Sequence, residues 1–232
     1  MSIRKNLDIT AYLIVGPENT NGRPIGEVVS QALRAGFTCF QIRSKGTDAQ
    51  SLIEYLREAA DAISAAGKQD EVALLVNDRL DVALASRDLG IKVDGVHVGQ
   101  SDIPPEICRK YLGEDAIVGF TAAKYDMVEY IRAYDASCID YYGVGPLRAT
   151  ATKRDLSTDE AGNLITQNLG SLREIARVAT VPVVVGGGVT ADDVPMIRSA
   201  GLQGFFVVSA VCGSDDPYEA AKELVDAWNG VE

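Results

Sequence analysis

The chain has 232 residues, of which 47% are hydrophobic, and it carries a formal net charge of −11. This excess of acidic groups opposes binding to nucleic acid and to anionic membrane surfaces. No apolar run approaches the roughly 20 residues needed to cross a bilayer. We therefore expect a cytoplasmic protein with no nucleic-acid or membrane partner, in which local cations or a metal hold any bound phosphate.

No linker-like tract or low-complexity run divides the sequence, so we expect one domain over residues 1–232. The four cysteines are widely scattered and show no CxxC spacing: Cys39, Cys108, Cys138 and Cys212. This distribution favours reduced, partly buried thiols over a metal site or a disulfide framework.

Short apolar runs alternate with longer amphipathic segments along the chain. The runs predict eight strands, at residues 11–15, 37–42, 73–76, 95–98, 117–120, 139–142, 182–185 and 204–208. The segments between and after them predict helices at residues 26–35, 49–65, 80–87, 105–111, 125–134, 169–179, 192–199 and 217–228. Strands separated by single helices pair in parallel with right-handed crossovers. The order predicts an α/β protein with a single-domain (β/α)8 fold, a TIM barrel.

In such barrels the chemistry lies at the carboxyl ends of the strands. Gln41, Arg43 and Lys45 alternate along the end of the second predicted strand, so their side chains point to one side of the sheet. Burying two cations under the helices is costly, which favours the barrel mouth. Two positive charges there would suit an anionic ligand.

Three polar residues follow the third and fourth predicted strands. Asn77, Asp78 and Asp102 have an ordinary interpretation as helix N-caps. As two carboxylates on adjacent strand ends in a site rich in cations, Asp78 and Asp102 instead suggest a divalent ion, most simply Mg²⁺. His97, the only histidine, lies inside the fourth strand, and we interpret it as hydrogen-bonded within the barrel rather than catalytic.

Three later strand ends offer phosphate contacts. Thr150, Thr152 and Lys153 follow a glycine-rich turn and could hold a phosphate or diphosphate, although a solvated loop explains them equally well. The glycines at 186–188 permit close backbone approach, or serve only a tight turn. Ser209, after the eighth strand, could complete a second phosphate site.

Six segments occur in order along the chain: QIRSK, LLVNDRLDVAL, GVHVGQSD, DYYGVGPLRATATK, PVVVGGGV and GFFVVSAV. In combination they resemble the thiamine-phosphate synthase (thiamine-phosphate pyrophosphorylase) family over nearly the whole chain. The resemblance implies a Mg²⁺-dependent, usually homo-oligomeric (β/α)8 enzyme. Such an enzyme joins 4-amino-2-methyl-5-(diphosphooxymethyl)pyrimidine to 4-methyl-5-(2-phosphooxyethyl)thiazole and releases thiamine phosphate and diphosphate, a transfer of an alkyl group.

The resemblance also implies a role for each matching residue. The residues implied to hold the pyrimidine diphosphate are Gln41, Arg43, Lys45, Asn77 and Thr121, where Thr121 stands in place of the family's usual serine. Asp78 and Asp102 match the Mg²⁺ ligands. The residues implied to contact the thiazole phosphate are Thr150, Thr152, Gly188, Val208 and Ser209. Lys153 matches a diphosphate contact, and it joins Arg43 and Lys45 as the expected catalytic residues.

Two further departures are Ser44, in place of an acidic residue, and Gly186, in place of an apolar one. Two other functions stay open. A thiazole tautomerase-like paralogue would bind thiazole phosphate without needing the whole diphosphate clamp and both aspartates. A non-catalytic phosphate-ligand-binding barrel would be expected to have lost at least one charged ligand.

Overall fold

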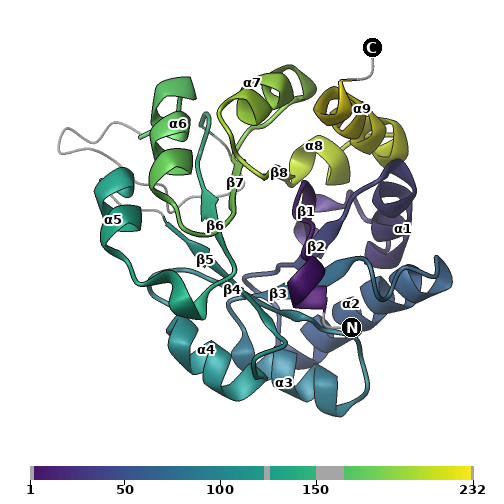
Figure 1. Ribbon diagram of the computed structural model, residues 1–232. Coiled ribbons are helices and arrows are strands. Elements are labelled where there is room, and N and C mark those ends of the chain that lie inside the picture. Colours follow the sequence, from purple (N-terminus) through teal and green to yellow (C-terminus); the bar gives the residue numbers. More distant parts are fainter. Residues whose placement is uncertain (1–2, 123–125, 150–164, 231–232) are drawn as a thin grey trace.

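The computed structural model describes residues 3–122, 126–149 and 165–230. Its eight parallel strands close into a barrel in sequential order, and β1 pairs with both β2 and β8. Figure 1 shows the helices arranged around this barrel. The predicted (β/α)8 fold is therefore confirmed.

The strands lie close to their predicted positions. They are β1 (Ala11–Val15), β2 (Cys39–Ile42), β3 (Ala73–Asn77), β4 (Gly95–Val98), β5 (Ile117–Thr121), β6 (Tyr141–Val144), β7 (Val183–Gly186) and β8 (Gly204–Val207). The helices are α1 (Ile25–Ala35), α2 (Ala49–Ala65), α3 (Leu80–Asp88), α4 (Pro105–Leu112), α5 (Met127–Ala133), α6 (Leu169–Val178), α7 (Val194–Ser199), α8 (Ser209–Cys212) and α9 (Pro217–Asn229). Four short 3-10 turns accompany them: Ile3–Asn6, Pro17–Asn19, Ala136–Cys138 and Ala191–Asp193.

Local sequence signals explain where the longer helices begin and end. Asp48 caps α2 by accepting a hydrogen bond from the backbone N–H of Ser51 at 2.9 Å. Asp216 caps α9 in the same way, and Gly230 ends it in the left-handed conformation that glycine adopts without strain. The α2 stripe that includes Leu52 and Leu56 is buried against the barrel.

Two apolar layers stabilise the barrel. One layer fills the space between strands and helices. The other fills the barrel interior and includes Tyr12, Leu75, Tyr141 and Val184. Each large apolar side chain that is fully buried contributes about 1.5–3 kcal/mol. Because side chains alternate across each strand, the residues that continue the inner layer toward the carboxyl ends face the mouth of the barrel.

Many strand and helix boundaries differ from those predicted by one or two residues. Local contacts accompany two of these differences. The sixth strand begins at Tyr141 rather than residue 139, because the Asp140 carboxylate is held at the amino end of the barrel by Arg4 and Arg109. The eighth strand ends one residue early, because Val208 is the N-cap of the unpredicted helix α8. All four cysteines are free, as expected.

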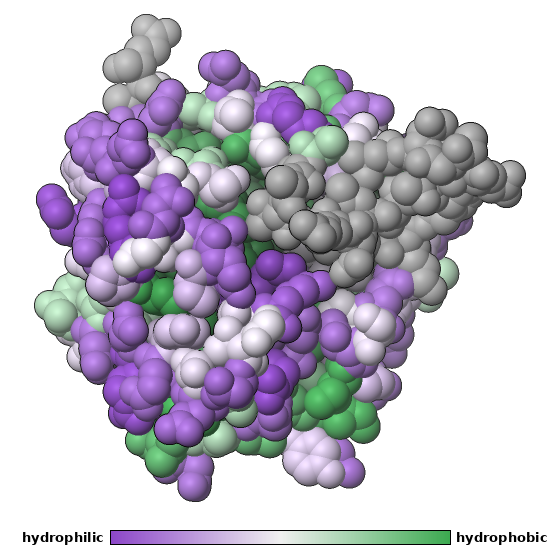
Figure 2. Space-filling model, turned by 180° about the vertical axis from the view of Figure 1, so that it is seen from behind, coloured by the Kyte–Doolittle hydropathy of each residue, from purple (hydrophilic) through white to green (hydrophobic). Residues whose placement is uncertain are grey.

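The described surface is mostly polar, with one concentration of large apolar side chains. Five such side chains are exposed, and all lie on or next to α3 and α4: Leu84, Leu89, Ile103, Ile107 and Tyr111. Figure 2 shows apolar side chains at the lower edge of the molecule, the edge that α3 and α4 form in Figure 1. No described helix is both long and apolar enough to cross a membrane.

Candidate functional site

A cavity of about 610 Å³ opens at the carboxyl ends of the strands. Each strand contributes to its wall: Tyr12, Gln41, Asn77, His97, Thr121, Gly143, Val184 and Phe206. The cavity also brings together every predicted site residue that the structure describes: Gln41, Arg43, Lys45, Asn77, Asp78, Asp102, Thr121, Gly188, Val208 and Ser209. The other three predicted residues, Thr150, Thr152 and Lys153, lie outside the described residues.

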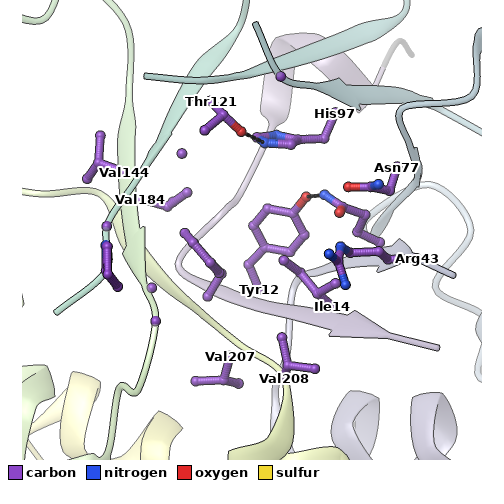
Figure 3. A pocket seen from close by; sticks show the side chains of 18 of the residues that line it. Tyr12, Ile14, Arg43, Asn77, His97, Thr121, Val144, Val184, Val207 and Val208 are labelled. Carbon is purple, nitrogen blue, oxygen red and sulfur yellow. Dashed lines mark hydrogen bonds between the residues drawn. The ribbon is translucent and has the colours of Figure 1, made fainter. Parts of the chain in front are cut away.

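The end of β2 supplies the cationic wall. Gln41 lies deepest, is 1% exposed, and donates a hydrogen bond from its amide to the Tyr12 hydroxyl. Arg43 and Lys45 follow it toward the mouth, and Figure 3 shows the Arg43 side chain directed into the cavity near Asn77. The predicted placement of these residues at the mouth, rather than under the helices, is confirmed.

The ends of β3 and β4 supply the carboxylates. The Asn77 amide donates to Oδ2 of Asp78 at 2.6 Å, and Oδ2 of Asp102 accepts from the backbone N–H of Gly99 at 2.7 Å. The N-caps of α3 and α4 are Arg79 and Pro104, and neither helix has a side-chain cap among the described residues. The N-cap interpretation of Asn77, Asp78 and Asp102 is therefore wrong.

The two carboxyl groups interact unfavourably. Burial, followed by the charge and hydrogen bonding of Asp102, raises the pKa of Asp78 to about 6. The Asn77 hydrogen bond and the charge of Lys45 oppose this rise only in part. A divalent cation held by Asp78 and Asp102 would offset their repulsion, and hard oxygen donors suit Mg²⁺.

The chain supplies few further ligands for such a cation. The described residues contain no cluster of three or more His, Cys, Asp or Glu side chains arranged for a metal. Mg²⁺ is commonly held by one or two carboxylates together with water and substrate phosphate oxygens. Asp78 and Asp102 match that pattern.

The loop after β6 is bound to the end of β7. The backbone N–H groups of Leu147 and Arg148 both donate to the carbonyl of Gly187 at 3.1 Å. Arg148 also holds both carboxylate oxygens of Asp193 at 2.7 Å and donates to the carbonyl of Gly188. Sequence reasoning assigned no role to Arg148, because a lone arginine in a turn gives no sign of its distant partner.

Helix α8 completes the opposite wall. It starts at Ser209, and the N–H groups of Ser209 and Ala210 have no acceptor within the helix, as is general for a first turn. Ser209 and Ala210 are exposed toward the cavity. Gly188, with φ of 77°, lines the same wall. Backbone donors and a hydroxyl thus gather where the sequence predicts phosphate contacts.

Polar side chains also cross the floor of the cavity. Nδ1 of His97 lies 2.9 Å from the Tyr141 hydroxyl, and Nε2 lies 2.8 Å from Oγ1 of Thr121. The interpretation of His97 as hydrogen-bonded within the barrel is confirmed. The Tyr141 hydroxyl lies 2.9 Å from that of Tyr12. Sequence reasoning missed both tyrosines, although their inward strand positions were available as a signal.

Comparisons with known proteins agree on one family. The sequence model of the thiamine monophosphate synthase family matches residues 11–211. The chain is 38% identical to the thiamine-phosphate synthase of Natronomonas pharaonis over 97% of each chain. It is 35% identical to that of Clostridium novyi, over 95% of this chain and 99% of the relative. The solved thiamine phosphate pyrophosphorylase of Pyrococcus furiosus has a TM-score of 0.77 and 26% identity over 96% of each chain.

Proposed function

Since the chain belongs to the thiamine monophosphate synthase family, we propose that its barrel mouth joins 4-amino-2-methyl-5-(diphosphooxymethyl)pyrimidine to 4-methyl-5-(2-phosphooxyethyl)thiazole. The products are thiamine phosphate and diphosphate, so the enzyme is a transferase. The observation that carries the proposal is one cavity that combines Arg43 and Lys45 with two neighbouring carboxylates. The family relationship supplies the identity of the substrates.

The pyrimidine diphosphate is assigned to the β2–β5 side of the cavity. Arg43 and Lys45 hold the diphosphate, with Gln41, Asn77 and Thr121 beside them. Asp78 and Asp102 are the residues that would hold Mg²⁺. When bound, Mg²⁺ supplies positive charge that stabilises the departing diphosphate.

The thiazole phosphate is assigned to the β6–β8 side. Gly188, Val208 and Ser209 contact the phosphate, supported by the backbone N–H groups at the start of α8, which have no acceptor within that helix. Thr150 and Thr152 join them, and Lys153 contacts the diphosphate. These last three assignments rest on the family resemblance alone.

The reaction breaks the bond between the pyrimidine methylene carbon and a diphosphate oxygen, and the electron pair leaves with diphosphate. The lone pair of the thiazole nitrogen forms the new carbon–nitrogen bond. Because that nitrogen carries no proton, the site needs no general base. In the structure the ring nitrogens of His97 contact Tyr141 and Thr121. Catalysis then rests on fixed positive charge around the leaving group.

The test is the identification of products by chromatography after incubation with both substrates and Mg²⁺. The proposal predicts thiamine phosphate only when both substrates are present. Proton exchange on thiazole phosphate without thiamine phosphate would instead support the tautomerase-like alternative. Binding of either substrate with no product would support the non-catalytic one.

A homo-oligomer is also proposed. The apolar side chains exposed on α3 and α4 form the kind of surface that another copy of the chain covers in an oligomer. Tyr111→Ser combined with Ile107→Ser should reduce the mass measured by analytical ultracentrifugation. An unchanged mass would place any interface elsewhere. The cytoplasmic location stays a prediction from the sequence.

A further inference from the structure

Five polar side chains form an unbroken series across the interior of the barrel. The Gln41 amide donates to Tyr12, whose hydroxyl lies 2.9 Å from that of Tyr141. Tyr141 lies 2.9 Å from Nδ1 of His97, and Nε2 of His97 lies 2.8 Å from Oγ1 of Thr121. Figure 3 shows the contact between His97 and Thr121 at one end of this series. Gln41 and Thr121, its two ends, both line the cavity.

The direction of the series follows from giving each hydroxyl proton an acceptor. Each phenol has one proton to donate, and burial raises the pKa of both Tyr12 and Tyr141 far enough to keep that proton in place. The Tyr12 hydroxyl accepts from Gln41, and among the described residues the only acceptor left for its own proton is Tyr141. The Tyr141 proton then goes to Nδ1 of His97. A neutral imidazole that accepts at Nδ1 carries its proton on Nε2. Nε2 therefore donates to Thr121.

The surroundings hold His97 in this orientation. A Cβ atom added to Gly119 would lie 2.2 Å from Cζ of Tyr141 and 2.5 Å from Nδ1 of His97, so only glycine leaves room for their contact. The two rings stack with centroids 5.4 Å apart. The His97 carbonyl accepts from the backbone N–H of Asp78 at 2.8 Å. The imidazole thus has packing and hydrogen-bond constraints on several sides.

The Thr121 hydroxyl has one proton and two acceptor lone pairs. With one lone pair taken by His97, its proton needs an acceptor, and the described residues offer it no second hydrogen-bond partner. On the basis of the proposed function, we infer that His97 is a positioning residue. In its Nε2–H form it turns the Thr121 proton toward the cavity, where Thr121 donates to an acceptor atom of the pyrimidine diphosphate.

The tautomer can be measured without any substrate. His97 is the only histidine in the chain, so a sample labelled with ¹⁵N-histidine reports this one ring. The expected spectrum of the ligand-free protein shows a protonated Nε2 and an unprotonated Nδ1. In Tyr141→Phe, which removes the donor to Nδ1, the tautomer preference should weaken. A wild-type ring protonated on Nδ1, or on both nitrogens, would overturn the inference.

The role in positioning can be measured by kinetics. His97→Met cannot donate, and we expect it to raise the KM for pyrimidine diphosphate roughly tenfold while leaving the KM for thiazole phosphate near its wild-type value. His97→Gln, whose amide can donate from nearly the same place as Nε2, should restore most of the loss. Melting temperatures of the variants identify any that fail to fold, and the NMR measurement on the wild type does not depend on them.

A double-mutant cycle shows whether His97 acts through Thr121. In a Thr121→Val background, His97→Met should add no further change to the KM for pyrimidine diphosphate. If each substitution raised the KM for pyrimidine diphosphate by its own factor and the two factors multiplied in the double variant, the inference would be contradicted. Equal changes in the KM values for pyrimidine diphosphate and thiazole phosphate would also contradict it. A wild-type protein that forms no thiamine phosphate would refute the proposed function. The NMR spectrum would still show which nitrogen of His97 carries the proton, and so the direction of the hydrogen bonds from Gln41 to Thr121.

Discussion

A Cβ atom added to Gly186 would lie 2.1 Å from Cε2 of Phe206, because the two residues are register partners on β7 and β8 and both face the cavity. This contact explains why a glycine stands at 186. The Phe206 ring takes the space that a larger side chain at 186 would need. Phe206 also packs on Tyr12, with ring centroids 6.2 Å apart.

The first prediction concerns this pair. Gly186→Ala should lower the free energy of unfolding by about 1–3 kcal/mol, because the added methyl group overlaps the Phe206 ring. Combining it with Phe206→Ala should recover part of that loss, although Phe206→Ala alone is destabilising. Urea unfolding of the four proteins gives the coupling energy. Strictly additive losses would show that the two side chains do not compete for the same space.

The second prediction concerns Arg148, which joins the loop after β6 to Gly188 and Asp193. Arg148→Met should raise the KM for thiazole phosphate several-fold. The substitution removes the hydrogen bond to the Gly188 carbonyl, which joins that loop to the part of the cavity wall that Gly188 lines. The stability loss should stay below about 1 kcal/mol, since Arg148 is half exposed and exposed ion pairs contribute little. Arg132, on α5, is exposed to a similar extent as Arg148 and pairs with Glu129, so Arg132→Met should leave this KM unchanged.

The same pair predicts a dependence on pH. The Arg148 hydrogen bond is the largest cause that holds the pKa of Asp193 below its ordinary value. A carboxyl group with a lowered pKa stabilises the fold above about pH 4 and loses that contribution as the pH falls through its folded-state pKa. The stability difference between wild type and Arg148→Met should therefore shrink in strong acid. A difference that grows toward acid would contradict this assignment.

The third prediction concerns the carboxylates. Asp78→Asn should abolish activation by Mg²⁺, because it removes one of the two proposed ligands. In the presence of EDTA the variant should melt at a higher temperature than the wild type at neutral pH, because the substitution removes the repulsion between Asp78 and Asp102. Magnesium titrations of activity and thermal scans measure the two effects.

Asp81→Asn is the matched control for that experiment. Asp81 lies on α3, three residues beyond Asp78, and pairs with Arg79 outside the cavity. This variant should respond to Mg²⁺ as the wild type does. If Asp78→Asn also kept a wild-type magnesium response, Asp78 would not be a metal ligand.

The fourth prediction concerns Lys153. Because it is assigned to the departing diphosphate, Lys153→Ala should remove most turnover while the protein keeps its wild-type circular dichroism and melting temperature. Unchanged kcat would reject the role. This prediction rests on the sequence resemblance, since Lys153 lies outside the described residues.

The sequence predicts the barrel well, because apolar periodicity and helix caps are local signals. The strands at 11–15 and 95–98 and the helix at 49–65 match their predicted ranges. The charged residues of the mouth could also be located, since alternation places Arg43 and Lys45 on the same side of β2 as Gln41.

Other features depend on contacts between distant residues. Arg148 meets Asp193 from 45 positions away, and Tyr12 meets Tyr141 from 129 positions away. No local pattern reports either contact. The short helix α8 also escaped prediction, because four residues are too few to show a helical period.

The most direct test of the central claim is diphosphate release measured alongside thiamine phosphate. The wild-type protein should release one diphosphate for each thiamine phosphate formed, only with both substrates and Mg²⁺, and EDTA should stop the reaction. Arg43→Met should lower the rate of both products together. Tight binding of both substrates with neither product, or diphosphate release that is independent of the thiazole phosphate, would contradict the account.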